Sequence, residues 1–223
     1  MSERIDGNRL AAWLLIAAFI AVLNFAAFAS SKTASTPSDA LLFRWSFAVG
    51  GAVLLGIMIA ISLAISNGRP ALRAIRSSRI TLPAMIGLGL LAIAGVYVAS
   101  LLVTSLGGNP AREQGLVTEH WQSGRVAPFI ASVLVLTVLT PIAEELFIRG
   151  IGFGLLEPLG RVASIAGPAL VWALMHGLPA AIFPLFAFGI GIGYLRERSG
   201  STIPGMFVHG LYNGVALALA FTA

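Results

Sequence analysis

The chain has 223 residues, of which 57% are hydrophobic and only 10% are charged, whereas a soluble domain averages about 25% charged residues. Together with a mean hydropathy of +0.92, this composition excludes an ordinary cytosolic globule, a disordered chain and a nucleic-acid-binding protein. The sequence contains no cysteine, which excludes a disulfide framework, a thiolate zinc site and an iron–sulfur cluster. The formal charge is +5, but the arginines stand between long apolar runs, as they do in membrane proteins.

Seven apolar stretches are predicted to be transmembrane helices, because a helix needs about 20 apolar residues to cross the hydrocarbon core. They lack the alternation of a barrel wall. The expected fold is therefore an all-α polytopic transmembrane bundle of about seven helices in contact with membrane lipid. The first stretch is longer than a signal-peptide core, so we expect it to be retained as an anchor. In chain order the stretches cover residues 10–30, 44–65, 80–106, 126–156, 162–178, 180–195 and 203–222.

The basic residues predict the orientation of the chain in the membrane. If seven helices alternate in direction, nine arginines fall on one side and four basic residues on the other. Because cytoplasmic loops carry the excess of basic residues, we expect a multi-pass protein of the cell membrane with its N-terminus in the cytoplasm. The larger group is Arg4, Arg9, Arg69, Arg73, Arg76, Arg79, Arg161, Arg196 and Arg198, and the smaller is Lys32, Arg44, Arg112 and Arg125.

The one sizeable polar connection, residues 107–124, suggests a division of the chain. It contains Glu113, Glu119 and His120, and we expect it to be a solvated loop outside the cytoplasm. Residues 1–125 would then hold three helices with almost no buried polar groups, followed by this loop. Residues 126–223 would form a core of four helices that carries nearly all the polar residues of the membrane segments.

Three of these polar residues lie on the fourth predicted helix. An ionisable side chain within a bilayer is costly and is a functional hypothesis by default. Residues four apart share a helix face, so Glu145 is predicted to pair with Arg149. Glu144 diverges from Glu145 by about 100° around the helix and is therefore available for chemistry.

The later helices carry His176, His209 and Asn213. His209 and Asn213 are four residues apart and can point into one cavity. A break near residues 158–160 predicts a helical hairpin, in which Glu144 and His176 lie at about the same depth because they are about 22–26 Å from the turn.

These residue types fit peptide hydrolysis. A carboxylate and a hydrogen-bonded histidine can align and deprotonate water, as Glu144 and His176 would, while His209 and Asn213 suit an oxyanion hole. No serine or cysteine stands at comparable spacing to a base, which disfavours an acyl-enzyme. The competing mechanism is a zinc site with Glu144, His176 and His209 as ligands, although the sequence lacks His-Glu-x-x-His.

Three short motifs resemble the CAAX protease and bacteriocin-processing family (CPBP, also called Abi) of intramembrane endopeptidases. Their order and spacing on hydrophobic helices carry the resemblance, which covers roughly residues 126–216, and residues 193–201 are also similar. The motifs are Glu144-Glu145-x-x-x-Arg149, Trp172-x-x-x-His176 and His209-x-x-x-Asn213.

The resemblance implies an all-helical bundle with a catalytic cavity that faces the cytosol. It implies that Glu144 and His176 activate water, that His209 and Asn213 stabilise the oxyanion, and that the remaining motif residues give structural support, namely Glu145, Arg149 and Trp172. Trp172 takes the place of the family's usual phenylalanine, a change expected to affect packing more than chemistry. The resemblance also favours a metal-free glutamate mechanism without a cofactor over a zinc metalloprotease.

The predicted function is therefore hydrolysis of a membrane-associated, prenylated or bacteriocin-like peptide. The sequence ends ten residues after Asn213, which leads us to expect a short, bacterial-type member of the family. Three alternatives remain: a non-enzymatic scaffold or immunity protein of the same fold, a zinc-dependent variant of the protease, and a transporter that uses the carboxylates as a proton relay.

Overall fold

The computed structural model describes residues 6–31, 41–66, 75, 77–113 and 121–220, and within these ranges the regular structure is helical, without strands. Seven long helical segments lie close to the seven predicted stretches, which confirms the all-α bundle. Six of them are α1 (Gly7–Ser31), α2 (Trp45–Ser66), α4 (Leu82–Ser105), α9 (Arg161–Met175), α10 (Ile182–Ser199) and α11 (Ile203–Ala220). Short helical turns are η1 (Leu41–Phe43), α5 (Pro110–Glu113) and η6 (Pro179–Ala181).

The remaining long segment is a composite helix from residue 123 to residue 159. Two of its parts, η3 and η4, are π-helical and flank the short α7 that carries both glutamates. Thr137 donates its hydroxyl to the carbonyl of Val133 at 2.7 Å, a bond that bends helices. π turns are common at functional sites. The parts are η2 (Ser123–Arg125), α6 (Val126–Leu134), η3 (Val135–Leu139), α7 (Thr140–Glu145), η4 (Leu146–Gly152), α8 (Phe153–Leu156) and η5 (Glu157–Leu159).

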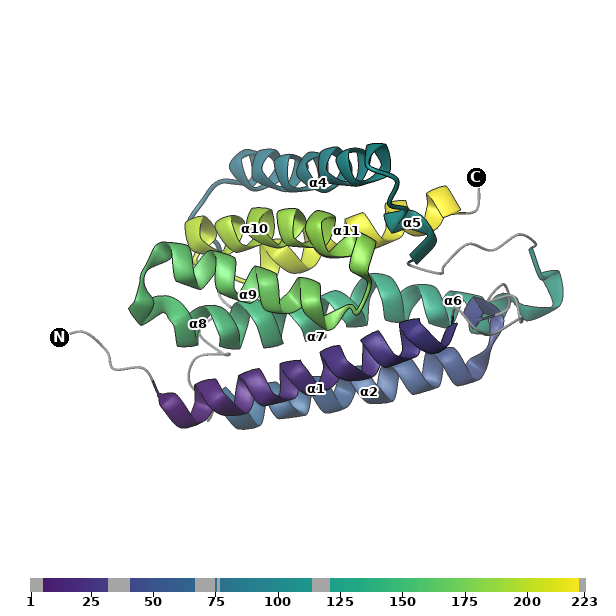
Figure 1. Cartoon of the computed structure of the whole chain (residues 1–223), viewed down its shortest axis with the longest axis horizontal. Coiled ribbons are helices and arrows are strands. Elements are labelled where there is room, and N and C mark those ends of the chain that lie inside the picture. The colour runs from purple at the N-terminus through teal and green to yellow at the C-terminus, as the bar shows by residue number, and fades with distance from the viewer. Residues whose placement is uncertain (1–5, 32–40, 67–74, 76, 114–120, 221–223) are drawn as a thin grey trace.

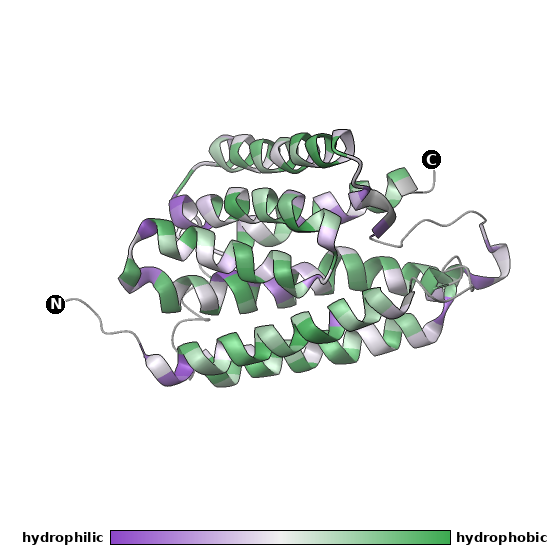
Figure 2. Cartoon of the chain, in the orientation of Figure 1, coloured by the Kyte–Doolittle hydropathy of each residue, from purple (hydrophilic) through white to green (hydrophobic). Residues whose placement is uncertain are grey.

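Among the described residues, five segments are long and apolar enough to cross a membrane: α1, α2, α4, the composite helix, and residues 179–199. α9 and α11 are shorter apolar helices. Large apolar side chains on the outside of the bundle are highly exposed, for example Leu15, Val162 and Phe207, and hydrophobic residues cover the outer helices in Figure 2. An apolar exterior of this extent is suited to lipid, and the chain is therefore a multi-pass membrane protein.

The helices run roughly side by side, with the segment from residue 121 to residue 220 in the middle of the bundle (Figure 1). α1 and α2 lie together on one side of it, and α4 packs on α10 at the other. The main buried core lies where α1, η4, α9 and α10 meet, and its largest fully buried members are Trp13, Phe147, Trp172 and Phe188. The described chain ends lie at opposite ends of the bundle.

The turns at the ends of α9 have clear local causes. The predicted hairpin turn near residue 159 is present, since Gly160 adopts a φ of 95° directly before α9 begins. α9 ends at Met175, three residues earlier than predicted, because Gly177 adopts a φ of 65°, the left-handed conformation that commonly ends a helix. Glu113 accepts a hydrogen bond from the Ala180 N–H at 2.7 Å and so caps the next helical segment from the loop where a solvated side chain was expected.

Some of the residues used to predict the orientation and the polar loop lie outside the described ranges. They are Arg4, Lys32, Arg69, Arg73, Arg76, Glu119 and His120.

Candidate active site

A fully buried ion pair lies at the centre of the bundle. Arg149 Nη1 is 3.0 Å from Glu145 Oε1, and both side chains are almost completely shielded from solvent. The other guanidinium nitrogen, Nη2, donates to the carbonyl of Gly189 at 3.2 Å. The pair predicted from the four-residue spacing is therefore present. It joins the composite helix to α10, and each charge compensates the other in a low-dielectric environment.

His209 of α11 lies between the two glutamates. Its Nδ1 is 3.1 Å from Glu145 Oε1, and its Nε2 is 3.9 Å from Glu144 Oε2. An ionised carboxylate only accepts hydrogen bonds, so Nδ1 donates to Glu145. Glu145 thus orients both Arg149 and His209, while the opposite edge of the imidazole is directed toward Glu144.

The second oxygen of Glu145 points to the first turn of α11. Oε2 is buried and has no hydrogen-bond partner among the described residues. A Cβ atom at Gly205 would lie 3.1 Å from this oxygen and 2.9 Å from Ile192 Cγ2, so glycine permits the close approach. The N-terminal end of a helix carries a partial positive charge, which favours a nearby carboxylate.

Glu144 is held by Trp172 of α9. The indole Nε1–H donates to Glu144 Oε2 at 2.5 Å, and the Glu144 side chain keeps 17% of its surface exposed, whereas that of Glu145 keeps none. The two neighbouring carboxylates therefore differ as expected: Glu145 binds Arg149, and Glu144 remains accessible. The tryptophan adds a hydrogen-bond donor that a phenylalanine at this position lacks.

His176 lies directly after α9 and is half-buried. Its Nδ1 is 2.8 Å from the backbone carbonyl of Trp172. Because a carbonyl can only accept, Nδ1 carries the hydrogen, and the neutral ring has its lone pair on Nε2. The Trp172 indole makes edge-to-face contacts with the rings of His176 and His209, at centroid distances of 4.6 and 5.4 Å. Glu144, His176 and His209 thus meet around one aromatic side chain.

Asn213 of α11 makes a hydrogen bond to the composite helix. Its Nδ2 donates to the carbonyl of Leu136 in η3 at 2.9 Å, which joins α11 to the first π-helical segment. The amide nitrogen has two hydrogens, and this bond uses one of them. The structure therefore shows Asn213 fixed beside the composite helix, with its second amide hydrogen not used by this bond.

The zinc-site alternative requires three ligand side chains to converge on one point. Among the residues that the structure describes, no three histidine, aspartate or glutamate side chains converge in the way that a metal site requires. Glu144, His176 and His209 have the donor atoms that zinc prefers, and Glu144 Oε2 and His209 Nδ1 are already hydrogen-bonded to Trp172 and Glu145.

Two residues of α1 donate hydrogen bonds to the segments that carry the candidate site. This contact was not anticipated, because the first three helices were expected to contribute almost no buried polar groups. The fully buried Trp13 donates its indole N–H to the carbonyl of Phe147 in η4 at 3.0 Å. Asn24 donates to the carbonyl of Met175, next to His176, at 2.7 Å. Asn24 is the one amide side chain in the apolar stretch 10–30, a signal that could have indicated a role. Both hydrogen bonds cross the expected division at residue 125.

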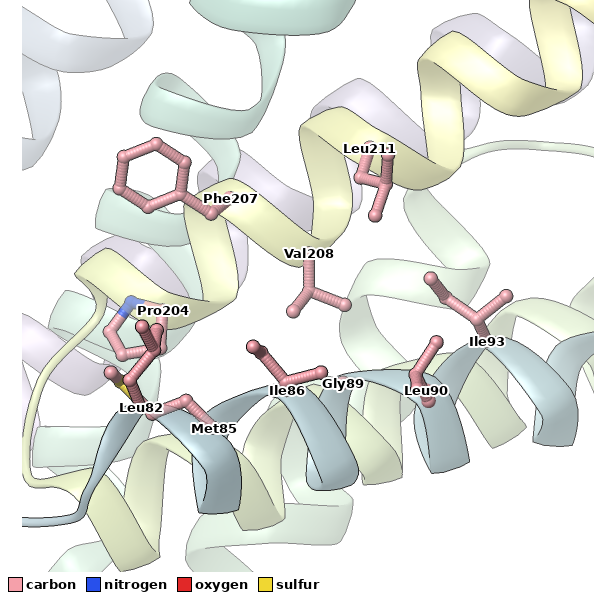
Figure 3. Close-up of a pocket in the computed structure, with 10 residues that line it drawn as sticks. All are labelled: Leu82, Met85, Ile86, Gly89, Leu90, Ile93, Pro204, Phe207, Val208 and Leu211. Atoms are coloured by element: carbon pink, nitrogen blue, oxygen red, sulfur yellow. The ribbon is translucent and has the colours of Figure 1, made fainter.

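An apolar groove of about 230 Å³ lies between α4 and α11 (Figure 3). Pro204, Phe207, Val208 and Leu211 line it from α11, facing Leu82, Met85, Ile86, Gly89, Leu90 and Ile93 of α4. Each residue of a helix is rotated by about 100° from the one before, so His209 and Asn213 lie on a different face of α11 from the groove.

A comparison with known families found a match to the segment that carries the candidate site. Residues 126–215 match a family model described as "Type II CAAX prenyl endopeptidase Rce1-like", and this range contains all three motifs. Neither a search of curated proteins nor a search of solved structures returned a match. Residues 126–215 of the chain are therefore similar to the Rce1-like family of CAAX proteases.

Proposed function

We propose that the chain is an intramembrane endopeptidase in which Glu144 and His176 activate the attacking water. The observation that carries the proposal is the meeting of Glu144, His176 and His209 around Trp172 inside a segment that matches a peptidase family. A partly accessible carboxylate beside a histidine with a free ring nitrogen is a suitable general base with a water-orienting partner.

The proposed reaction is a direct hydrolysis. His176 Nε2 accepts a hydrogen bond from the water, and Glu144 removes its other proton as the water oxygen attacks the peptide carbonyl carbon. Glu144 then returns this proton to the amide nitrogen as the carbon–nitrogen bond breaks. The new bond joins the water oxygen to the carbonyl carbon, and this oxygen keeps the proton that faces His176, so the products are a carboxylic acid and an amine, which ionise to a carboxylate and an ammonium group.

Two donors are available for the oxyanion. For His209 Nε2 to donate while Nδ1 donates to Glu145, the imidazole must carry both hydrogens, and it then lies between two carboxylates. The second N–H of Asn213 is the other proposed donor. Donors held in place by existing bonds stabilise the developing charge without reorganisation, and the Glu145 and Leu136 bonds hold these two side chains.

The proposed substrate is a membrane-associated peptide of the prenylated or bacteriocin-like kind. The family description names prenyl endopeptidases, and the candidate site lies among helices that suit a bilayer. Such a substrate would reach the site from the membrane rather than from bulk water.

A substitution at Glu144 tests the enzymatic function. With purified protein in lipid nanodiscs and a library of fluorogenic lipidated peptides, we expect the wild type to cleave and Glu144→Gln to lose cleavage. The matched control is Glu197→Gln, because Glu197 forms a 3.4 Å ion pair with Arg161 at the protein surface, and we expect this variant to retain activity. Peptide binding without cleavage by the wild type would instead indicate a scaffold, and cleavage by Glu144→Gln would refute the mechanism.

We further propose that the protein lies in the cell membrane with its N-terminus in the cytoplasm. Because the chain contains no cysteine, single cysteines can report the orientation. Leu159→Cys, at the turn before α9, should react with a membrane-impermeant thiol reagent only from the cytoplasmic side, and Leu106→Cys, directly after α4, only from outside. Both side chains are exposed, and the reverse labelling pattern would overturn the orientation.

A further inference from the structure

Trp172 makes hydrogen bonds to both residues of the proposed water-activating pair, through different atoms. Its indole N–H donates to Glu144 Oε2 at 2.5 Å, and its backbone carbonyl accepts from His176 Nδ1 at 2.8 Å. The side chain is 1% exposed, and the guanidinium carbon of Arg149 lies 5.0 Å from its ring centroid. The indole is therefore fixed in place by its surroundings.

We propose that Trp172 is a positioning residue whose indole N–H orients the Glu144 carboxylate for proton transfer. The inference rests on the proposed function of Glu144 as the general base. The terminal torsion of a glutamate is broad, so a carboxylate without a fixed partner samples many orientations. An indole N–H only donates, so it holds the carboxylate without competing for the water's proton.

The bond also assigns different tasks to the two carboxylate oxygens. Oε2 accepts from Trp172 and is the oxygen that lies 3.9 Å from His209 Nε2. Oε1 is then the oxygen of Glu144 that receives the proton from water. A carboxylate that is oriented before the reaction avoids the cost of ordering it in the transition state.

Trp172→Phe separates the effect of the indole hydrogen bond from the effects of the aromatic ring and of the backbone carbonyl. Phenylalanine keeps an aromatic ring beside both histidines but has no N–H, so the bond to Glu144 is lost. The backbone carbonyl that holds His176 remains after any substitution at this position. Trp172→Phe therefore removes the side-chain hydrogen bond while the tautomer of His176 stays fixed.

The test compares the kinetics of Trp172→Phe with those of the wild type in nanodiscs. A hydrogen bond to a charged group corresponds to roughly a ten- to hundredfold change, so we expect kcat to fall by about that factor. KM should change little, because Trp172 acts through Glu144 and not on the substrate. The matched control is Trp45→Phe, the same substitution at an exposed tryptophan at the start of α2. We expect it to keep the wild-type kcat.

A folded Trp172→Phe variant with the wild-type kcat would overturn the inference, as would a loss that appears only in KM. Failure of the proposed function has a different signature, namely full activity of Glu144→Gln or an inactive wild type. Ultraviolet resonance Raman spectroscopy reports the strength of indole hydrogen bonds directly. This measurement therefore requires neither an activity assay nor the Trp172→Phe variant. Leucine cannot accept a hydrogen bond, so Glu144→Leu should shift the Trp172 signal toward weaker hydrogen bonding in the difference spectrum against the wild type. An unchanged spectrum would show that the bond between Trp172 and Glu144 does not exist.

Discussion

Replacing Arg149 by methionine tests how the buried charges stabilise the bundle. Removal of one partner of a buried ion pair costs about 3–5 kcal/mol, because the other charge is left uncompensated. We therefore expect Arg149→Met to lower the free energy of unfolding by about this amount. Methionine has a similar length and no charge, so the change isolates the electrostatic contribution and the hydrogen bonds.

The contacts of Arg149 explain the size of the expected loss. The variant loses the 3.0 Å bond to Glu145 and the 3.2 Å bond to the carbonyl of Gly189. The Glu145 carboxylate then keeps only the bond from His209 Nδ1, since its Oε2 has no partner among the described residues. A buried carboxylate with a single donor is poorly compensated.

Equilibrium unfolding in mixed micelles, followed by circular dichroism, measures this loss. Arg161→Met is the control, because the Arg161–Glu197 pair is partly exposed and such pairs contribute about 0–1 kcal/mol. The double variant Glu145→Met/Arg149→Met should be less destabilised than Arg149→Met alone, because no isolated charge remains. Equal losses in Arg149→Met and Arg161→Met, or a double variant worse than the single one, would refute the reasoning.

Three further outcomes are expected. Asn24→Leu removes the hydrogen bond to the Met175 carbonyl, which should lower the free energy of unfolding by about 1 kcal/mol and also lower kcat. A variant with the wild-type stability and the wild-type kcat would contradict a role of Asn24 in holding His176. Gly177→Ala should lower the free energy of unfolding by at least about 1–3 kcal/mol for the left-handed backbone conformation alone. The new Cβ would also lie 2.4 Å from the Asn24 backbone, which adds to this loss. Gly154→Ala, with open space around it, should stay within about 1 kcal/mol of wild type. Equal thermal unfolding of the two glycine variants would refute that contrast. Dialysis against a chelator should leave cleavage intact and elemental analysis should find no stoichiometric zinc, whereas chelator-sensitive activity would support the zinc-dependent variant.

Periodic and local features of the sequence predicted much of this structure. The apolar stretches correspond to the long helices, because the length of a membrane helix is set by the bilayer. The pairing of Glu145 with Arg149, and the separation of Glu144 from that pair, follow from the angle between successive residues on a helix. Both predictions depend only on positions within one helix, where geometry is known before the tertiary fold.

The features that the sequence did not reveal depend on contacts between distant segments. The π-helical segments η3 and η4 flank the two glutamates in a largely apolar helix, and the hydrophobic pattern of the sequence does not mark them. The Trp172 bond to Glu144 joins residues 28 positions apart, and its donor was read as a packing residue. The partner of Asn213 is a backbone carbonyl 77 positions away, which no side-chain pattern can indicate.

The hydrogen bonds of α1 constrain the order of events during biosynthesis. Trp13 and Asn24 are synthesised early, but their acceptors, Phe147 and Met175, follow 134 and 151 residues later. Domains form as the ribosome releases the chain, from the N-terminus onward, so the first helix must wait in the bilayer with both donors unused. The centre of the bundle can be completed only when the late helices have been synthesised, and a nascent chain released before Met175 lacks the acceptor for Asn24.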